Sequence, residues 1–316
     1  AIISIYLGDM LSDIVAQLES GETRGTKKGG AMSLGARTLP QIPRHASDRN
    51  RTSPFAFTGN KFEFRAVGSS QAVGWPNTVL NTIVAESLDY IATALEKALG
   101  KGEPTPAKLE SAVRALLKEI VSEHKRIIFD GDNYTQKWRE EAAARGLPNN
   151  RETVSALAPL TSKKAADLFS RYNVLDKTEL AARASIFFEK YNKQIVIEAR
   201  SMVSVARRWV LPAALQHQTR LADAIASAKA VDLDCQDARE DLEHVAELIS
   251  RMREAIGRVE DAIAHSDDDP HKEAVHLRDK AVPAMADLRE TVDELEQHVA
   301  DDLWPLPTYR EMLFIK

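Results

Sequence analysis

The sequence predicts a mainly α-helical protein with one small β element. Apolar residues recur at helical spacing through most of the 316 residues, with long stretches over 77–99, 107–127 and 177–231. Only residues 53–67 contain the alternation of apolar and charged side chains that marks a half-buried strand. Two heptad-like runs follow near the end of the chain. Together these patterns indicate a short β-bearing part followed by long antiparallel helices.

The first elements can be placed from their end signals. Residues 3–19 have apolar side chains at helical spacing, and Gly21 follows as a stop. Residues 53–67 predict a β-hairpin because a Thr58-Gly59-Asn60 turn precedes the alternating run 61–67. A short helix is expected around Trp138.

The last part of the chain predicts a helical hairpin. Its first apolar seam contains Leu242, Val245, Ile249, Met252, Ile256, Val259 and Ile263, and its second contains Leu288, Val292, Leu295 and Val299. The acidic turn 265–270 separates the two seams, and Pro270 is well placed to begin a helix. Pro212 is expected to kink the helix that precedes this hairpin.

Composition excludes several classes of protein. The net charge of -5 and the pI near 6.0 argue against a nucleic-acid binder that works by bulk charge. No apolar run reaches the roughly 18 residues of a transmembrane helix, so no membrane span is expected. Cys235 is the only cysteine, which favours a reducing, cytoplasmic compartment. The chain starts without Met inside an amphipathic pattern, which suggests that it is cut from a longer protein.

The predicted hairpin carries the residues that could bind a ligand or take part in a reaction. Strand alternation places Lys61, Glu63 and Arg65 on one face and Phe62 and Phe64 on the other, where the phenylalanines are expected to pack inward. Three charges of mixed sign can line a polar cavity, bind an anion or face solvent. From the alternation alone, a face exposed to solvent is favoured, because antiparallel sheets commonly have one solvated face.

A glycine-rich segment, residues 21–51, precedes the hairpin. A structureless stretch of this length is usually a functional loop or a disordered one. Arg24, Lys27 and Lys28 lie among its glycines and could form a flap over a phosphate, but the spacing of a Walker motif is absent. From the sequence alone, a mobile surface loop is the favoured interpretation.

The run from Asp48 to Ser70 resembles a signature of glutamine synthetases, in particular of their type III branch. Asn50-Arg51 followed by Glu63-Phe64-Arg65 is similar to the catalytic pattern of the superfamily. The sequence of residues 52–60 is similar to that of the type III branch. Three further segments also look like type III sequence, namely 129–134, 145–149 and 304–309. The resemblance spans essentially the whole chain.

This resemblance implies the C-terminal part of such an enzyme. Residues 1–100 would be the end of the catalytic barrel domain, and residues 101–316 a helical C-terminal region specific to type III. The family joins ammonia to glutamate with ATP through γ-glutamyl phosphate, and it uses Mg²⁺ or Mn²⁺. The implied partners are therefore glutamate, ammonia and ATP, together with further copies of the chain in a large homo-oligomer of stacked rings.

The resemblance also implies a role for four residues. Arg51 matches the arginine that stabilises the transferring phosphoryl group, and Arg65 matches the one that holds the carboxylate of glutamate. Glu63 matches a carboxylate ligand of the metal, for which a hard oxygen donor is suited. Lys61 would meet a nucleotide phosphate.

This sequence departs from the family pattern in two places. Phe55-Ala56-Phe57 stands where better-known members carry a further arginine, and Lys61 stands where they often carry arginine, whose planar fork lysine lacks. Glu63 is the one recognisable ligand of the metal shell, so the chain alone is expected to be inactive. The alternative function is a helical oligomerisation or interaction module without catalytic activity. Under either function, residues 233–303 are expected to contact other subunits rather than to carry chemistry, and a hairpin that packs only on its own subunit is the alternative.

Overall fold

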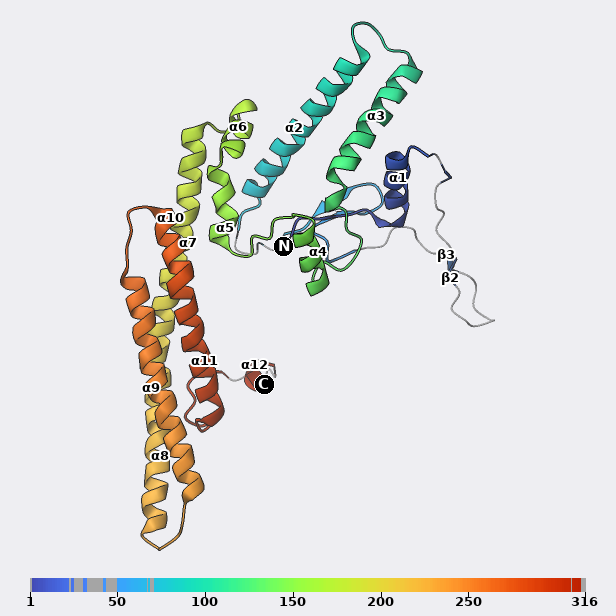
Figure 1. The fold of residues 1–316 in the computed structure, drawn as a ribbon. Coiled ribbons are helices and arrows are strands. Elements are labelled where there is room, and N and C mark those ends of the chain that lie inside the picture. The colour runs from blue at the N-terminus through green and yellow to red at the C-terminus, as the bar shows by residue number, and fades with distance from the viewer. Residues whose placement is uncertain are drawn as a thin grey trace. The chain divides into compact units, whose positions relative to one another are not determined.

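The computed structural model describes residues 2–22, 24–25, 31–32, 42–43, 50–66, 68, 71–307 and 309–313. These residues form two compact units, which Figure 1 shows in blue to green and in yellow to red. The first unit extends to residue 156 and includes residues 163–176. The second unit contains residues 157–162 and everything from residue 177 onward. The mainly helical fold with a small sheet that the sequence predicts is confirmed.

The first unit combines short strands with helices of varied length. Its strands are β1 (Ile5–Tyr6), β2 (Ala31–Met32), β3 (Ile42–Pro43), β4 (Phe55–Phe57) and β5 (Phe62–Phe64). Its helices are α1 (Gly8–Ser20), α2 (Gly74–Leu99), α3 (Pro106–His124), α4 (Gln136–Ala144) and α6 (Lys163–Arg171), and α5 (Thr153–Leu157) ends at the boundary between the units.

A three-stranded sheet organises this unit. β4 lies in its centre, with β1 parallel on one edge and β5 antiparallel on the other. The predicted hairpin is therefore confirmed, and Gly59 makes its turn with a φ of 93°, a conformation that favours glycine. β1 was not predicted. It takes up residues 5–6 of the segment expected to be helical, and the helix begins at Gly8 and stops, as predicted, before Gly21.

The second unit is built on three long helical stretches. The first consists of α7 (Lys177–Val205), a π-helical turn (Ala206–Val210) and α8 (Leu211–Lys229). The second is α9 (Gln236–Ala264). The third consists of α10 (Pro270–His276), a π-helical turn (Leu277–Ala281) and α11 (Val282–His298), and the short α12 (Tyr309–Leu313) follows. Figure 1 shows the three stretches side by side.

The core of this unit lies between all three stretches. Buried side chains of α9, among them Leu248, Met252 and Ile256, pack with Val210 and Ala214 on one side and with residues of α11 on the other. The predicted antiparallel hairpin of α9 and α11 is confirmed, and Pro270 begins α10 as expected. The predicted seams are covered by a third helical stretch of the same unit, so they offer little apolar surface to another subunit.

Each π-helical turn is followed closely by a proline. Pro212 and Pro283 both lie two residues beyond the end of a π turn. A proline within a helix lacks the amide hydrogen, and its ring clashes with the carbonyl four residues earlier. The wider π turn relieves that clash, because the amide before each proline bonds instead to the carbonyl five residues back. Both helices therefore continue past their prolines.

Among the helices of the described residues, none combines the length and the apolar composition needed to cross a membrane.

Burial in the three-stretch core predicts a large difference between two isoleucines of the second unit. Ile256 of α9 is 2% exposed, whereas Ile197 of α7 is 64% exposed. Ile256→Ala leaves a cavity and is expected to lower the free energy of unfolding by about 2–5 kcal/mol. The matched control Ile197→Ala is expected to change it by less than about 1 kcal/mol. Urea unfolding followed by the helical circular dichroism signal measures both, and equal effects would contradict this packing.

Candidate functional site

The β4–β5 hairpin brings the predicted charged residues together. Arg65 donates from Nη2 and Nε to Oε2 of Glu63, at 2.8 and 3.3 Å. Nζ of Lys61 lies 3.7 Å from the other carboxylate oxygen of Glu63, and the hydroxyl of Thr58 donates to that oxygen at 3.2 Å. Lys61, Glu63 and Arg65 therefore share one face of β5, as the alternation predicts.

Arg65 also connects this charged face to the loop that carries Arg51. Its Nη1 donates to the backbone carbonyl of Asn50. Arg51 follows Asn50 directly, and its exposed side chain makes no hydrogen bond or ion pair with any residue that the structure describes. The four candidate residues thus come from one hairpin and the loop before it, with Arg65 as the link between them.

The opposite face of the hairpin corrects one expectation. Phe62 and Phe64 do not pack inward, because they are 49% and 38% exposed. They lie against Phe55 and Phe57, with ring centroids 5.4 to 5.8 Å apart. The alternation was right, but the choice of the covered face was wrong. Ala56, which pairs with Glu63 across the hairpin, is fully buried, so the more enclosed face is the one that carries the charges.

The charges of this face act on the Glu63 carboxylate. The hydrogen bonds from Arg65 are the largest influence, and they hold the pKa of Glu63 below its ordinary value. Glu63 is therefore ionised at neutral pH, with its oxygens directed at Arg65, Thr58 and Lys61.

The donor set of the described residues does not complete a metal site. No group of three or more His, Cys, Asp or Glu side chains in the described part of the chain is arranged to hold a metal ion. Glu63 contributes a single carboxylate, and one of its oxygens is already bound by Arg65. A magnesium or manganese ion needs several oxygen ligands, so the described residues alone do not fit such an ion.

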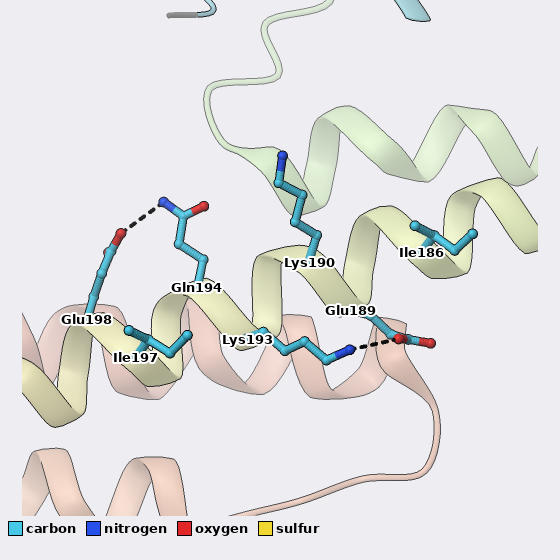
Figure 2. Close-up of a pocket in the computed structure, with 7 residues that line it drawn as sticks. All are labelled: Ile186, Glu189, Lys190, Lys193, Gln194, Ile197 and Glu198. Carbon is cyan, nitrogen blue, oxygen red and sulfur yellow. Dashed lines mark hydrogen bonds and ion pairs between the residues drawn. The ribbon is translucent and has the colours of Figure 1, made fainter. Parts of the chain in front are cut away.

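Depressions on the surface of the second unit are distinct from this face. Figure 2 shows one of them along α7, lined by residues of that helix alone, where Ile186 and Ile197 flank charged side chains. The polar side chains between the two isoleucines bond within the helix, from Lys193 to Glu189 at 3.2 Å and from Gln194 to Glu198 at 2.9 Å. We therefore do not assign chemistry to it.

The glycine-rich segment adds little to the site. Of its three basic residues, Arg24 is exposed and pairs with Glu22, whereas Lys27 and Lys28 lie outside the described residues. The same holds for Asp48, Arg49, Val67, Ser69 and Ser70 of the signature run and for Thr308 near the end of the chain. The flap stays a prediction.

The ion pair in the hairpin predicts how Glu63 titrates. Because the folded-state pKa is lowered, the pairing is present at neutral pH and is lost as the pH falls through that pKa, below the ordinary value. Arg65→Gln removes the guanidinium and is expected to raise the pKa of Glu63 towards that value. Arg114→Gln, which breaks the separate pair with Glu110 on α3, is the control. Carboxyl-carbon NMR titration measures both, and an unchanged Glu63 in Arg65→Gln would contradict the pairing.

Comparison with known proteins shows which proteins the chain is similar to. A sequence profile described as the glutamine synthetase C-terminal domain matches residues 112–229. The whole chain is 38% identical to a type-3 glutamine synthetase of Dictyostelium discoideum and spans 43% of that protein. It is also 31% identical to a glutamine synthetase of Bacteroides fragilis, of which it spans 44%. The chain thus spans less than half of the length of these relatives, and along its whole length it matches the C-terminal part of proteins named glutamine synthetase.

Proposed function

We propose that the chain forms one edge of the active site of a glutamate–ammonia ligase, which uses ATP to join ammonia to glutamate through γ-glutamyl phosphate. The observation that best supports this proposal is the position of Arg65, whose guanidinium joins Glu63 to the backbone of Asn50. The candidate groups for metal, substrate and phosphate all lie within residues 51–65, and this link joins the loop that carries Arg51 to the strand that carries Glu63. The names of the relatives support the same reaction.

Arg65 is suited to hold the carboxylate of glutamate. Its guanidinium is planar and presents several donors in a fixed geometry that matches a carboxylate. In the structure, two of these donors already bind a carboxylate oxygen, that of Glu63. A substrate carboxylate offers the same acceptor chemistry, and it would replace Glu63 on this edge of the guanidinium.

Arg51 and Lys61 are the groups suited to phosphate. Both side chains are exposed, and Lys61 stands 3.7 Å from a Glu63 oxygen. Phosphoryl transfer spreads negative charge over the oxygens of the moving group, and a fixed arginine stabilises that charge. We assign this task to Arg51. Lys61 would act on a nucleotide phosphate as a point charge, because an ammonium cannot make the paired bonds of a guanidinium.

Glu63 would give one oxygen to a Mg²⁺ or Mn²⁺ site whose other ligands are not among the described residues. Since the residues present do not hold an ion alone, we derive no step through the metal. The domain division at residue 100, the cytoplasmic setting and the stacked-ring homo-oligomer are further parts of the proposal, and they rest on the family resemblance. Any contact between subunits through the second unit would have to use faces other than the buried seams of α9 and α11.

Arg65 provides the first test of the proposed site. In the complete enzyme, Arg65→Lys keeps the charge but loses the fork, so we expect weaker binding of glutamate by about 1–3 kcal/mol. The Michaelis constant for glutamate should rise accordingly, with that for ATP nearly unchanged. Arg114→Lys on the exposed face of α3 is the matched control. An unchanged Michaelis constant for glutamate in Arg65→Lys would remove Arg65 from the substrate site.

Glu63 provides the second test. Glu63→Ala removes both an oxygen ligand and its negative charge, so we expect it to abolish metal-dependent glutamine synthesis in the complete enzyme. Glu110→Ala, an exposed glutamate of α3, should leave the rate unchanged. Rates measured over a range of Mg²⁺ and Mn²⁺ concentrations separate weaker metal binding from lost chemistry. Near-normal turnover of Glu63→Ala at ordinary Mg²⁺ would exclude Glu63 as a ligand.

A further inference from the structure

The segment 130–133 belongs to the family-like run 129–134, for which the sequence alone suggests no role. The structure places it beside the loop that carries Arg51. Nδ2 of Asn50 donates to the carbonyl of Gly131 at 3.2 Å, and the backbone amide of Asn133 donates to the hydroxyl of Thr52 at 3.1 Å. These two contacts join segments that are 81 residues apart in the chain. They hold the residues immediately before and after Arg51.

We propose that the turn 130–133 is a positioning element for Arg51. It fixes the backbone on both sides of this residue and so sets the direction in which the guanidinium is presented. The inference rests on the proposed function, because it assigns to Arg51 the task described above. None of the residues 130–133 is proposed to touch a substrate.

Asn50 transmits the position of the turn to the loop. Its Oδ1 accepts hydrogen bonds from the backbone amides of Thr52 and Ser53, at 2.9 and 2.7 Å. Because an oxygen must face those two amides, the NH₂ group of the side chain must face the carbonyl of Gly131. The amide of Asn50 thus uses both ends, one to shape the loop around Arg51 and one to attach that loop to the turn.

The turn is itself held from several directions. Oδ1 of Asp130 accepts hydrogen bonds from the backbone amides of Leu7 and Gly8, at 2.9 and 3.0 Å, at the beginning of α1. The buried hydroxyl of Ser4 donates to Oδ1 of Asn133 at 2.5 Å. The amide of Phe129 donates to the carbonyl of Ile5 in β1 at 3.0 Å. The turn is therefore fixed to the sheet that also carries Glu63 and Arg65.

Aromatic packing leaves room only for glycine at position 131. The ring of Phe129 stacks on Trp138, which is almost fully buried, with centroids 3.9 Å apart. The guanidinium carbon of Arg145, a residue of another family-like segment, lies over the Trp138 ring, 5.4 Å from its centroid. A Cβ added to Gly131 would come within 2.5 Å of the Phe129 ring. Since that ring is held by its stack, a side chain at 131 would have to displace the backbone whose carbonyl binds Asn50.

The decisive variants change single atoms at Thr52. Thr52→Val has nearly the same shape but loses the hydroxyl, which accepts from the Asn133 amide and also donates to Oδ1 of Asn50 at 3.3 Å, whereas Thr52→Ser keeps it. In the complete enzyme we expect Thr52→Val to lower kcat about 10- to 100-fold, because small misplacement of a group that acts in the transition state lowers the rate by such factors. The Michaelis constant for glutamate should change little, and Thr52→Ser should retain most of the activity.

A double-mutant cycle with Arg51→Ala separates positioning from a merely structural effect. If Thr52 acts through Arg51, Thr52→Val should cause little further loss in the Arg51→Ala background. An equal fold-loss in both backgrounds would overturn the inference, and so would wild-type kcat in Thr52→Val. Asn50→Asp, which keeps the acceptor oxygen but cannot donate to Gly131, is the second variant, and it should follow the same pattern. The melting temperature of each variant identifies any that fails to fold.

The same experiments distinguish the two proposals. If the complete wild-type protein forms no glutamine from glutamate, ammonia and ATP, the proposed function fails. If the wild type is active and Arg51→Ala is as active as the wild type, the role of Arg51 fails, and with it the inference. If Arg51→Ala keeps only a small, measurable fraction of the wild-type kcat but Thr52→Val and Asn50→Asp are fully active, only the inference about the turn fails.

Discussion

Strand β4 is hydrogen-bonded along both of its edges, and the candidate site depends on this arrangement. Its antiparallel partner β5 follows after a short turn, so that pairing needs little chain closure. Its parallel partner β1 lies about 50 residues earlier in the chain, and residues 128–129 attach to β1 in turn. Three distant segments therefore meet in one small sheet. Glu63 and Arg65 are held on that sheet, and the Arg51 loop is held at its margin.

Local pattern was sufficient for the hairpin because its geometry follows from alternation. Lys61, Glu63 and Arg65 fall on one face in any strand that contains them. Which face is covered depends on how the hairpin packs against distant parts of the chain, and alternation does not determine that. Hydrophobicity suggested that the phenylalanines pack inward, whereas the small Ala56 is the residue that is fully enclosed.

The contacts around Arg51 could not be predicted from the sequence in the same way. β1 has two residues, too few for any periodic signal. The bonds from Asn50 to the carbonyl of Gly131 and from the amide of Asn133 to Thr52 involve backbone atoms, which every residue possesses. The family-like sequence of residues 129–134 indicated that the segment matters, but only the fold shows that it contacts Asn50 and Thr52.

The second unit shows how the width of an apolar stripe indicates the number of neighbours. The predicted seam of α9 followed a narrow heptad pattern, which is enough for one partner helix. Leu248 and Ala255 lie beside that seam and are also fully buried. A stripe of this width faces two neighbours, in this case α11 on one side and the stretch of α7 and α8 on the other. Counting these two residues would have predicted three packed stretches in place of a pair.

The π turns have a consequence for chain length. A π turn accommodates one more residue than an α turn, and here buried residues lie on both sides of each π turn. In the rest of α7 or α9, removing one residue would rotate all later side chains by about 100° and take them out of the core. Within 206–210 or 277–281, the loss of one residue can be absorbed by tightening the turn to α-helical geometry, provided that the proline beyond it is replaced. The unit therefore contains two places where its length can change by one residue with the same side chains still facing the core.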